Sequence, residues 1–336
     1  MTLLHSIWSR IDRFLAAILL TVAFAAVMPA RGEAATGVGW LADAAIVLLF
    51  FMHGAKLSPE EALVGARHWR LHVMVFLSTF ALFPLLGISA RFLVPGFLPG
   101  PLWAGVILLT ALPSTVQASI VFTSVAGGNV PAAMCSATAS SLLGVFLTPL
   151  IAGFLLASHG LEISAHSVLA IVMQLLVPFI AGQLLRPWIG GYLTRHPRAL
   201  KSVDYGSILI LVYSAFSHGV VDGIWHQIDA GDLFKVALVD IALLATVMTI
   251  LTFGSRQLGF SRADEIAIVF CGSKKSLVNG VPIASLLFAG HVGLVVIPLM
   301  LFHQIQLMVC ASLARHYAAR RVPASEPLPA LPAPSA

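Results

Sequence analysis

Ten apolar runs, each about as long as a membrane-spanning helix, constrain the fold of this 336-residue chain more than any other feature. A helix needs about 20 mostly apolar residues to cross the roughly 30 Å hydrocarbon core of a bilayer. The runs lie at 14–30, 38–54, 71–90, 101–125, 130–156, 164–186, 203–222, 233–254, 264–289 and 292–314. The sequence therefore predicts an all-α polytopic membrane protein with ten transmembrane helices.

The composition excludes most soluble classes of protein. Hydrophobic residues make up 59% of the chain and charged residues only 10%, against roughly half and a quarter in a soluble domain. No catalytic triad, zinc-binding helix, phosphate loop or paired carboxylates can be found, so we expect no enzyme. The three cysteines have no metal-ligand or disulfide spacing, so we expect no metal site or cofactor. The basic residues do not cluster with aromatic ones, which argues against a nucleic-acid partner.

Lysine and arginine residues indicate the orientation, because positively charged loops stay in the cytoplasm. With the N-terminus inside, fourteen of them fall in inside segments and three, Arg31, Arg91 and Lys235, fall outside. This asymmetry predicts a multi-pass protein in the lipid bilayer of the inner (plasma) membrane, with both termini cytoplasmic. One alternative stays open: Arg10 and Arg13 could begin a cleavable secretory signal, which would leave nine spans.

The two halves of the chain share short segments of weak sequence similarity. Residues 51–54 (FMHG) correspond to 216–219 (FSHG), and 148–150 (TPL) to 297–299 (IPL). Five spans repeated once must be inverted, and inverted repeats are typical of secondary transporters. The predicted division is a cytoplasmic N-terminus at 1–13, five-helix repeats at 14–156 and 164–314, and a cytoplasmic, disordered Pro/Ala-rich tail at 315–336.

Two spans contain helix-breaking residues at membrane depth. Pro113 with Ser114 interrupts span 4, and residues 272–276 (GSKKS) interrupt span 9. Backbone groups freed at this depth are tolerated only where they are buried in protein or line a cavity. Pro113 alone would also fit an ordinary kink. Its pairing with a second break favours a transport site, because broken helices in corresponding positions of the two halves mark such sites.

Lys274 and Lys275 are the strongest functional signal, since both lie at least ten residues from either end of span 9. A charge at the bilayer centre costs at least about 2.5–3.5 kcal/mol, so two adjacent charges need water, partner groups or a bound anion. The alternative, a cytoplasmic loop, conflicts with the apolar residues on both sides. Asp240 in span 8 could pair with one lysine. The predicted substrate-binding residues are Lys274, Lys275, Ser114, Thr115, Gln117, Ser119, Ser273, Ser276 and Asn279.

Four segments together resemble the bile acid:sodium symporter family, in its branch of solute carrier family 10 member 7 and bacterial sodium-dependent transporters. They are residues 51–58, 68–72, 112–117 and 272–277. The resemblance implies a panel of spans 1, 2, 6 and 7, and a core of spans 3, 4, 5, 8, 9 and 10 with crossed discontinuous helices 4 and 9. It also implies transport of a small organic anion by alternating access, typically by symport with sodium.

The sodium ligands implied by this resemblance are largely replaced. The Ser-Asn pair of the family falls on Ser119 and Ile120, the Glu of span 9 on Phe270, and the Gln-Asn pair on Lys274 and Lys275. Hard cations need oxygen ligands, so the sequence argues against sodium coupling, and a lysine ammonium could take the place of a sodium ion. Two alternatives stay open: a sodium-coupled symporter that uses backbone carbonyls, and a non-transporting regulator of ion or envelope homeostasis. The sequence leaves substrate identity and oligomeric state unpredicted.

Overall fold

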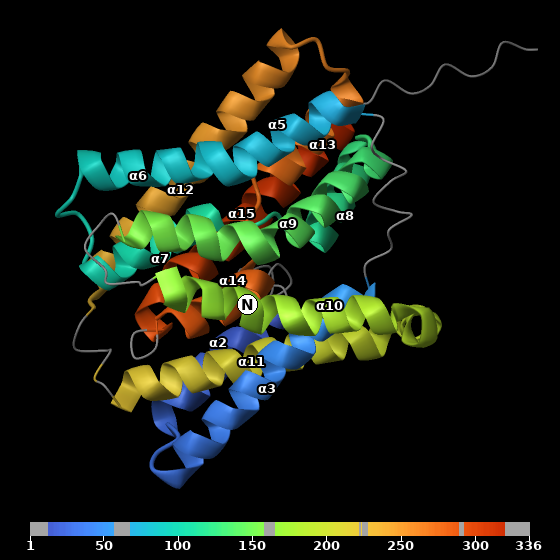
Figure 1. Cartoon of the computed structure of the whole chain (residues 1–336). Coiled ribbons are helices and arrows are strands. Elements are labelled where there is room, and N and C mark those ends of the chain that lie inside the picture. Colours follow the sequence, from blue (N-terminus) through green and yellow to red (C-terminus); the bar gives the residue numbers. More distant parts are fainter. Residues whose placement is uncertain are drawn as a thin grey trace, which may run out of the picture.

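The computed structural model describes residues 13–56, 68–157, 165–221, 223, 228–288 and 292–319, and its regular secondary structure is helical throughout these ranges (Figure 1). Nearly all of the predicted cytoplasmic N-terminus, 1–12, and most of the predicted tail, 320–336, lie outside the described residues. The first residues of that tail, 315–319, belong to the last helix instead. The prediction of disorder from residue 315 is therefore wrong for these five residues.

Each of the ten apolar runs coincides with one helix or with consecutive helices. In chain order they are α2 (Arg13–Val27), α3 (Glu33–Lys56), α5 (Trp69–Leu77), the π-helix η2 (Ser78–Leu82), α6 (Phe83–Leu93), α7 (Gly100–Ala111), α8 (Val116–Ala126), α9 (Val130–Ala157), α10 (Ala165–Arg195), α11 (Pro197–Val221), α12 (Ala230–Gln257), α13 (Arg262–Gly272), α14 (Leu277–Leu287) and α15 (Val292–Ala319).

The described helices confirm an all-helical membrane protein with many spans. Eight segments are long and apolar enough to cross a membrane, and α7 with α8 gives a ninth if this bent pair is one span. The first helix, α2, has 15 residues, fewer than the roughly 17–25 of a usual span. The tenth span therefore stays a prediction.

Local sequence signals set several helix ends. The Asp229 side chain accepts the N–H of Asp232 at the start of α12, and Ser261 accepts the N–H of Asp264 at the start of α13. Such side chains replace the missing backbone acceptors of a first helical turn. Gly127 ends α8 with φ 78°, a left-handed conformation that glycine adopts without strain.

The helices pack in two groups. In the first, α3 packs against α10 and α11, and α2 packs against α11; these helices fill the lower part of Figure 1. In the second, α15 contacts α7, α8, α12 and α14, while α13 contacts α8, α9 and α12. The two groups meet where α11 packs against α14 and α15, and where α10 packs against α9 and α14.

Large apolar side chains point outward from both groups. Examples are Phe154 on α9, Trp188 on α10 and Phe253 on α12, which are 75%, 76% and 59% exposed. A water-soluble monomer rarely exposes extended apolar surface of this kind, so these faces suit contact with lipid.

Two glycines allow the backbones of α3 and α10 to touch. A Cβ atom on Gly54 would overlap the carbonyl oxygen of Phe179, and one on Gly182 would overlap the carbonyl oxygen of Phe51. Any larger side chain at either position must therefore push the two helices apart.

Replacing Gly182 with alanine is expected to lower the free energy of unfolding by about 1–3 kcal/mol, the usual cost of overpacking. Gly191→Ala in the same helix is the matched control, because nothing lies within 4 Å of its added Cβ and alanine favours a helix by about 1 kcal/mol over glycine. Thermal unfolding in detergent compares the two variants. Equal melting temperatures would show that α3 and α10 do not touch at Gly182.

Candidate functional site

Two interrupted spans meet inside the second helix group. Span 4 is broken at 112–115, between α7 and α8, and bends there by 62°. Span 9 is broken at 273–276, between α13 and α14, but its halves still continue as one span of 26 residues. The N–H of Ser276 donates to the carbonyl oxygen of Pro113 over 2.9 Å. Both predicted breaks are therefore present and in direct contact, although only span 4 bends sharply.

Lys275 lies between the two breaks with its side chain 1% exposed. Its ammonium donates to the carbonyl oxygens of Thr79, Thr110 and Leu112 over 2.8, 2.7 and 2.7 Å. The Nζ atom also lies 4.2 Å from the centre of the Phe83 ring. Because an ammonium has three N–H donors, these three oxygens satisfy it completely. We call the three oxygens the carbonyl cage; the protonated Lys275 that fills it has no donor left for a ligand.

A π-helical turn explains why the Thr79 carbonyl is available. In η2 the N–H of Phe83 donates to the carbonyl oxygen of Ser78, five residues back. At the same spacing of five residues, the carbonyl oxygen of Thr79 would accept from residue 84. This residue is Pro84, which has no N–H. The carbonyl of Thr79 therefore lacks this helical partner and accepts from Lys275 instead.

The break at Pro113 likewise leaves backbone groups of span 4 without their helical partners. The N–H of Ser114, which would bond Thr110 in a continuous helix, donates to the Ser140 hydroxyl over 3.0 Å. Leu112 has an extended backbone, with ψ 151°, so its carbonyl lies outside the helical ladder. The break thus supplies the other two oxygens of the carbonyl cage.

Gln306 of α15 holds the backbone of the second break. Its side-chain oxygen accepts from the N–H of Lys275, and its Nε2 donates to the carbonyl oxygen of Lys275, both over 2.9 Å. The Gln306 side chain is completely buried and also contacts Nδ1 of His303 at 3.1 Å. Gln306 was not among the predicted site residues, although an amide in a long apolar run is a detectable signal.

Lys274 is also completely buried, but its surroundings differ. Its ammonium donates to the carbonyl oxygen of Ala118 over 3.0 Å and lies 4.1 Å and 5.1 Å from the ring centres of Phe122 and Phe270. The ring faces attract a cation, but only one oxygen among the described residues accepts from it. Of the two lysines, Lys274 is therefore the one with donors left for an anion.

Neither lysine has an acidic partner among the described residues. The ion pairs there join Lys56 to Asp204, Lys235 to Asp232, and both Arg256 and Arg262 to Glu265. Neither carboxylate oxygen of Asp240 has a hydrogen-bond partner, so Asp240 pairs with neither lysine. Carbonyl oxygens and aromatic rings contact the two ammonium groups, and the thiols of Cys271 and Cys310 also lie close enough to Lys274 to interact with its charge.

The side chain of Ser119 links span 4 to span 9, whereas those of Ser114 and Ser273 bond within their own spans. The hydroxyl oxygens of Ser114 and Ser119 lie 3.3 Å apart, and Ser119 also donates to the carbonyl oxygen of Phe270 over 3.2 Å. Ser273 donates to Val269 of its own helix over 2.6 Å. All three serines are completely buried. Ser273 directly precedes Lys274, and Ser119 directly follows Ala118, whose carbonyl oxygen accepts from Lys274.

The other four predicted residues lie at the starts of α8 and α14. Ser276 accepts from the N–H of Asn279, and the Asn279 amide approaches the Ser141 hydroxyl at 3.4 Å; both predicted residues are 5% exposed. Thr115 is half-buried with a hydroxyl that has no partner. Gln117 is exposed, so it does not belong to the buried cluster.

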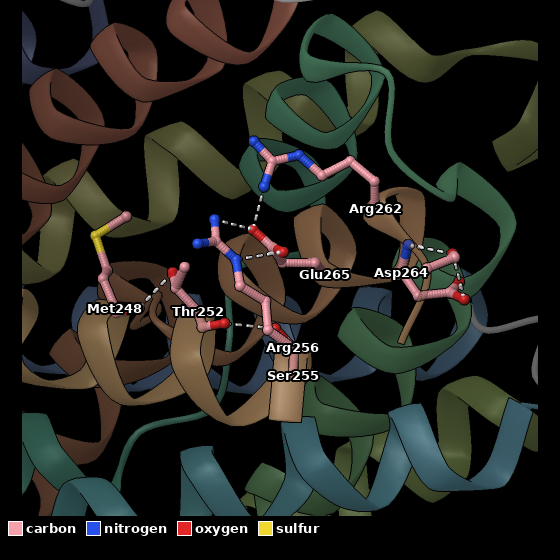
Figure 2. Close-up of polar contacts among 8 residues, drawn as sticks. Met248, Thr252, Ser255, Arg256, Arg262, Asp264 and Glu265 are labelled. Carbon is pink, nitrogen blue, oxygen red and sulfur yellow. Dashed lines mark hydrogen bonds and ion pairs between the residues drawn. The ribbon is translucent and has the colours of Figure 1, made fainter. Parts of the chain in front are cut away.

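An ionic cluster anchors the far end of α13. Figure 2 shows Arg256 and Arg262 converging on the carboxylate of Glu265, with Arg256 donating over 3.0 and 3.1 Å. The Glu265 side chain is 4% exposed, and the Arg262 guanidinium lies 4.5 Å from the centre of the Tyr317 ring. These contacts fix α13 against α12 and α15, and so help to position the break at its other end.

A bundle of membrane spans whose interruptions surround buried ionisable side chains is typical of membrane transporters. The chain belongs to the SBF-like CPA transporter family, whose model matches residues 12–319. This is a family of transporters and not of enzymes, and the predicted family resemblance is confirmed.

Three relatives illustrate the similarity. The chain is 51% identical over 308 residues to "Putative symporter YfeH" of Escherichia coli, covering 91% of this chain and 93% of that protein. It is 50% identical over 323 residues to the protein PA2026 of Pseudomonas aeruginosa, covering 96% and 97% of the two chains. It is 30% identical over 274 residues to "Sodium/bile acid cotransporter 7" of Xenopus tropicalis, covering 79% and 78%.

Proposed function

We propose that this protein is a secondary active transporter that moves a small organic anion across the inner membrane by alternating access, without sodium. The observation that carries the proposal is the pair of buried lysines where two interrupted spans meet. The described residues offer them no carboxylate. Uncompensated positive charge at membrane depth favours an anionic ligand.

The helix packing supports a panel and a core within this transporter. The group of α2, α3, α10 and α11 has the membership that the family resemblance gives the panel, and the other group has that of the core. We infer that the chain forms two inverted five-helix repeats, with crossed breaks in spans 4 and 9 and with both termini cytoplasmic, as the charge asymmetry predicts.

Lys274 and the first turn of α8 are the proposed contacts of the anion. The start of α8 has no side-chain cap, so its first N–H groups and the positive end of its dipole are available to a negative charge. Thr115 and Gln117 lie at this turn and offer further hydrogen bonds. The hydroxyl and amide groups around the breaks complete the proposed site: Ser114, Ser119, Ser273, Ser276 and Asn279.

Lys275 takes the proposed place of the coupling cation. Oxygen ligands such as the three of the carbonyl cage suit a sodium ion as well as an ammonium. Because Lys275 is covalently attached, it would supply the same charge at every stage of the transport cycle. This supports transport that needs no sodium gradient.

A sodium-coupled symporter is the second candidate, favoured by the relative named "Sodium/bile acid cotransporter 7". It would need a cation site in addition to the cage that Lys275 fills. A non-transporting regulator is not retained, because the family is one of transporters.

Thermal stability of the purified protein across a panel of organic anions, in sodium or potassium chloride, tests the proposal. A ligand at 100 times its Kd stabilises the folded state by about 2.7 kcal/mol. We expect at least one anion to raise the melting temperature equally in both salts. Stabilisation by sodium chloride alone would favour the sodium-coupled candidate, and a panel without any effect would contradict an anion site.

A further inference from the structure

Asp240 is, within the described ranges, the one carboxylate that is completely buried with neither oxygen bonded. It lies ten residues after Ala230, the first residue of α12, which is about 15 Å along the helix. The remaining 17 residues of α12 lie beyond it. The carboxyl group is therefore well inside the membrane span.

The surroundings of Asp240 on its own helix are apolar. Val236, Val239, Leu243 and Leu244 lie within four residues of it, on the same buried face. A buried carboxylate in such surroundings normally accepts hydrogen bonds or pairs with a cation. Asp240 does neither, so its burial needs another explanation.

Within the described part of the chain, the helices that pack on α12 supply no charged partner for Asp240. These are η2, which has no titratable residue, and α6, α13 and α15. On α6, Arg91 donates to the carbonyl oxygen of Pro95 and lies over the Trp103 ring; on α15, His303 contacts Gln306. The other titratable residues of α13 and α15 are Arg262, Asp264, Glu265, Cys271, Cys310, Arg315, His316 and Tyr317. No hydrogen bond joins any of these to Asp240.

A proton is the cation that this site suits. A metal ion would require several oxygen ligands, whereas a proton needs only the carboxylate itself. Binding it converts the charged carboxylate into a neutral acid and removes most of the cost of burying the charge. Ionisable residues that face the interior of a membrane protein commonly mark proton pathways.

We propose that Asp240 is a proton-binding site that couples proton movement to transport. The carboxylate takes up one proton on one side of the membrane, is buried as the neutral acid, and releases the proton on the other side as the carboxylate re-forms. The coupling of proton movement to anion transport rests on the proposed function. Proton binding by Asp240 does not depend on it. One proton moving with one organic monoanion transfers no net charge, and each unit of pH difference would support about tenfold accumulation.

Infrared difference spectroscopy of the protein in vesicles of phosphatidylethanolamine and phosphatidylglycerol tests the proton site without any substrate. We expect the absorption of a protonated carboxylic acid that disappears in Asp240→Asn and titrates reversibly with pH. Asp43→Asn is the matched control, because Asp43 is exposed on α3, and it should keep this signal. A spectrum that is the same in the wild type and in Asp240→Asn would overturn the inference. A carboxylic acid absorption that does not change with pH would also overturn it.

Uptake driven by a pH gradient tests the coupling. The probe is the radiolabelled anion that stabilises the purified protein most. We expect the wild type and Asp43→Asn to accumulate it, and Asp240→Asn to exchange it across the membrane without accumulation. Accumulation that persists in Asp240→Asn would overturn the coupling. If no anion stabilises the protein, the proposed function fails, while the infrared titration still decides whether Asp240 binds a proton.

Discussion

Replacing Lys275 with alanine is expected to make the stability of the protein depend on sodium ions. The substitution leaves the three oxygens of the carbonyl cage without their donor. Each buried polar group left unsatisfied costs about 1–3 kcal/mol, so in choline chloride the free energy of unfolding should fall by several kcal/mol. A sodium ion with water can occupy the vacated space, so added sodium chloride should restore part of the loss. Thermal unfolding of the purified variant at increasing sodium concentration measures the effect.

Lys275→Met is the matched control for the sodium effect. Methionine fills most of the lysine volume but donates no hydrogen bond, so this variant should be destabilised in choline and in sodium chloride alike. The wild type should also be insensitive to sodium, because its ammonium already fills the carbonyl cage. If Lys275→Ala melted at the same temperature in sodium and in choline, the three carbonyl oxygens would not form a cation site.

Replacing Lys274 with alanine is expected to weaken the stabilisation by anions strongly while the fold persists. The ammonium makes one hydrogen bond, to Ala118, and otherwise faces two aromatic rings, so its loss should cost the fold less than loss of Lys275. Truncating one partner of a buried charge pair costs about 2–5 kcal/mol. The apparent affinity for the anion should therefore fall by at least about 30-fold. The concentration dependence of the melting temperature measures this affinity.

Lys235→Ala separates this effect from a general loss of positive charge. Lys235 lies at the start of α12, where it is paired with Asp232 and its side chain is 41% exposed. This variant should bind the anion as the wild type does. If the anion affinity of Lys274→Ala were unchanged, the anion would bind away from the interruptions. This result would refute the role proposed for Lys274.

The sequence predicted the helices well because their signal is local. Each apolar run became a helix or a consecutive set of helices, and Pro113 and residues 272–276 marked both interruptions. It could not predict that span 4 bends by 62° while span 9 continues as one span. The direction of a chain after a break depends on the side chains that bind its free backbone groups. Here these are Ser140 and Gln306, which lie far away in sequence.

The candidate site was predictable only in part. The depth of Lys274 and Lys275 follows from hydropathy, but the acceptors are backbone carbonyls, which every residue carries. Gln117 was grouped with Ser119 by proximity in sequence, and the structure places one exposed and the other buried. Two residues correspond to about 200° around a helix, so side chains at this spacing lie on opposite faces once the helix resumes after the break.

Uptake of the most stabilising anion into vesicles that contain the purified wild-type protein tests the central proposal most directly. Uptake is compared with sodium or with potassium as the only alkali cation on both sides of the membrane. With Lys275 in place of the coupling cation, the initial rates should be equal in the two salts. Uptake that needs sodium would contradict this, because the protein would then hold a sodium ion that the lysine does not replace.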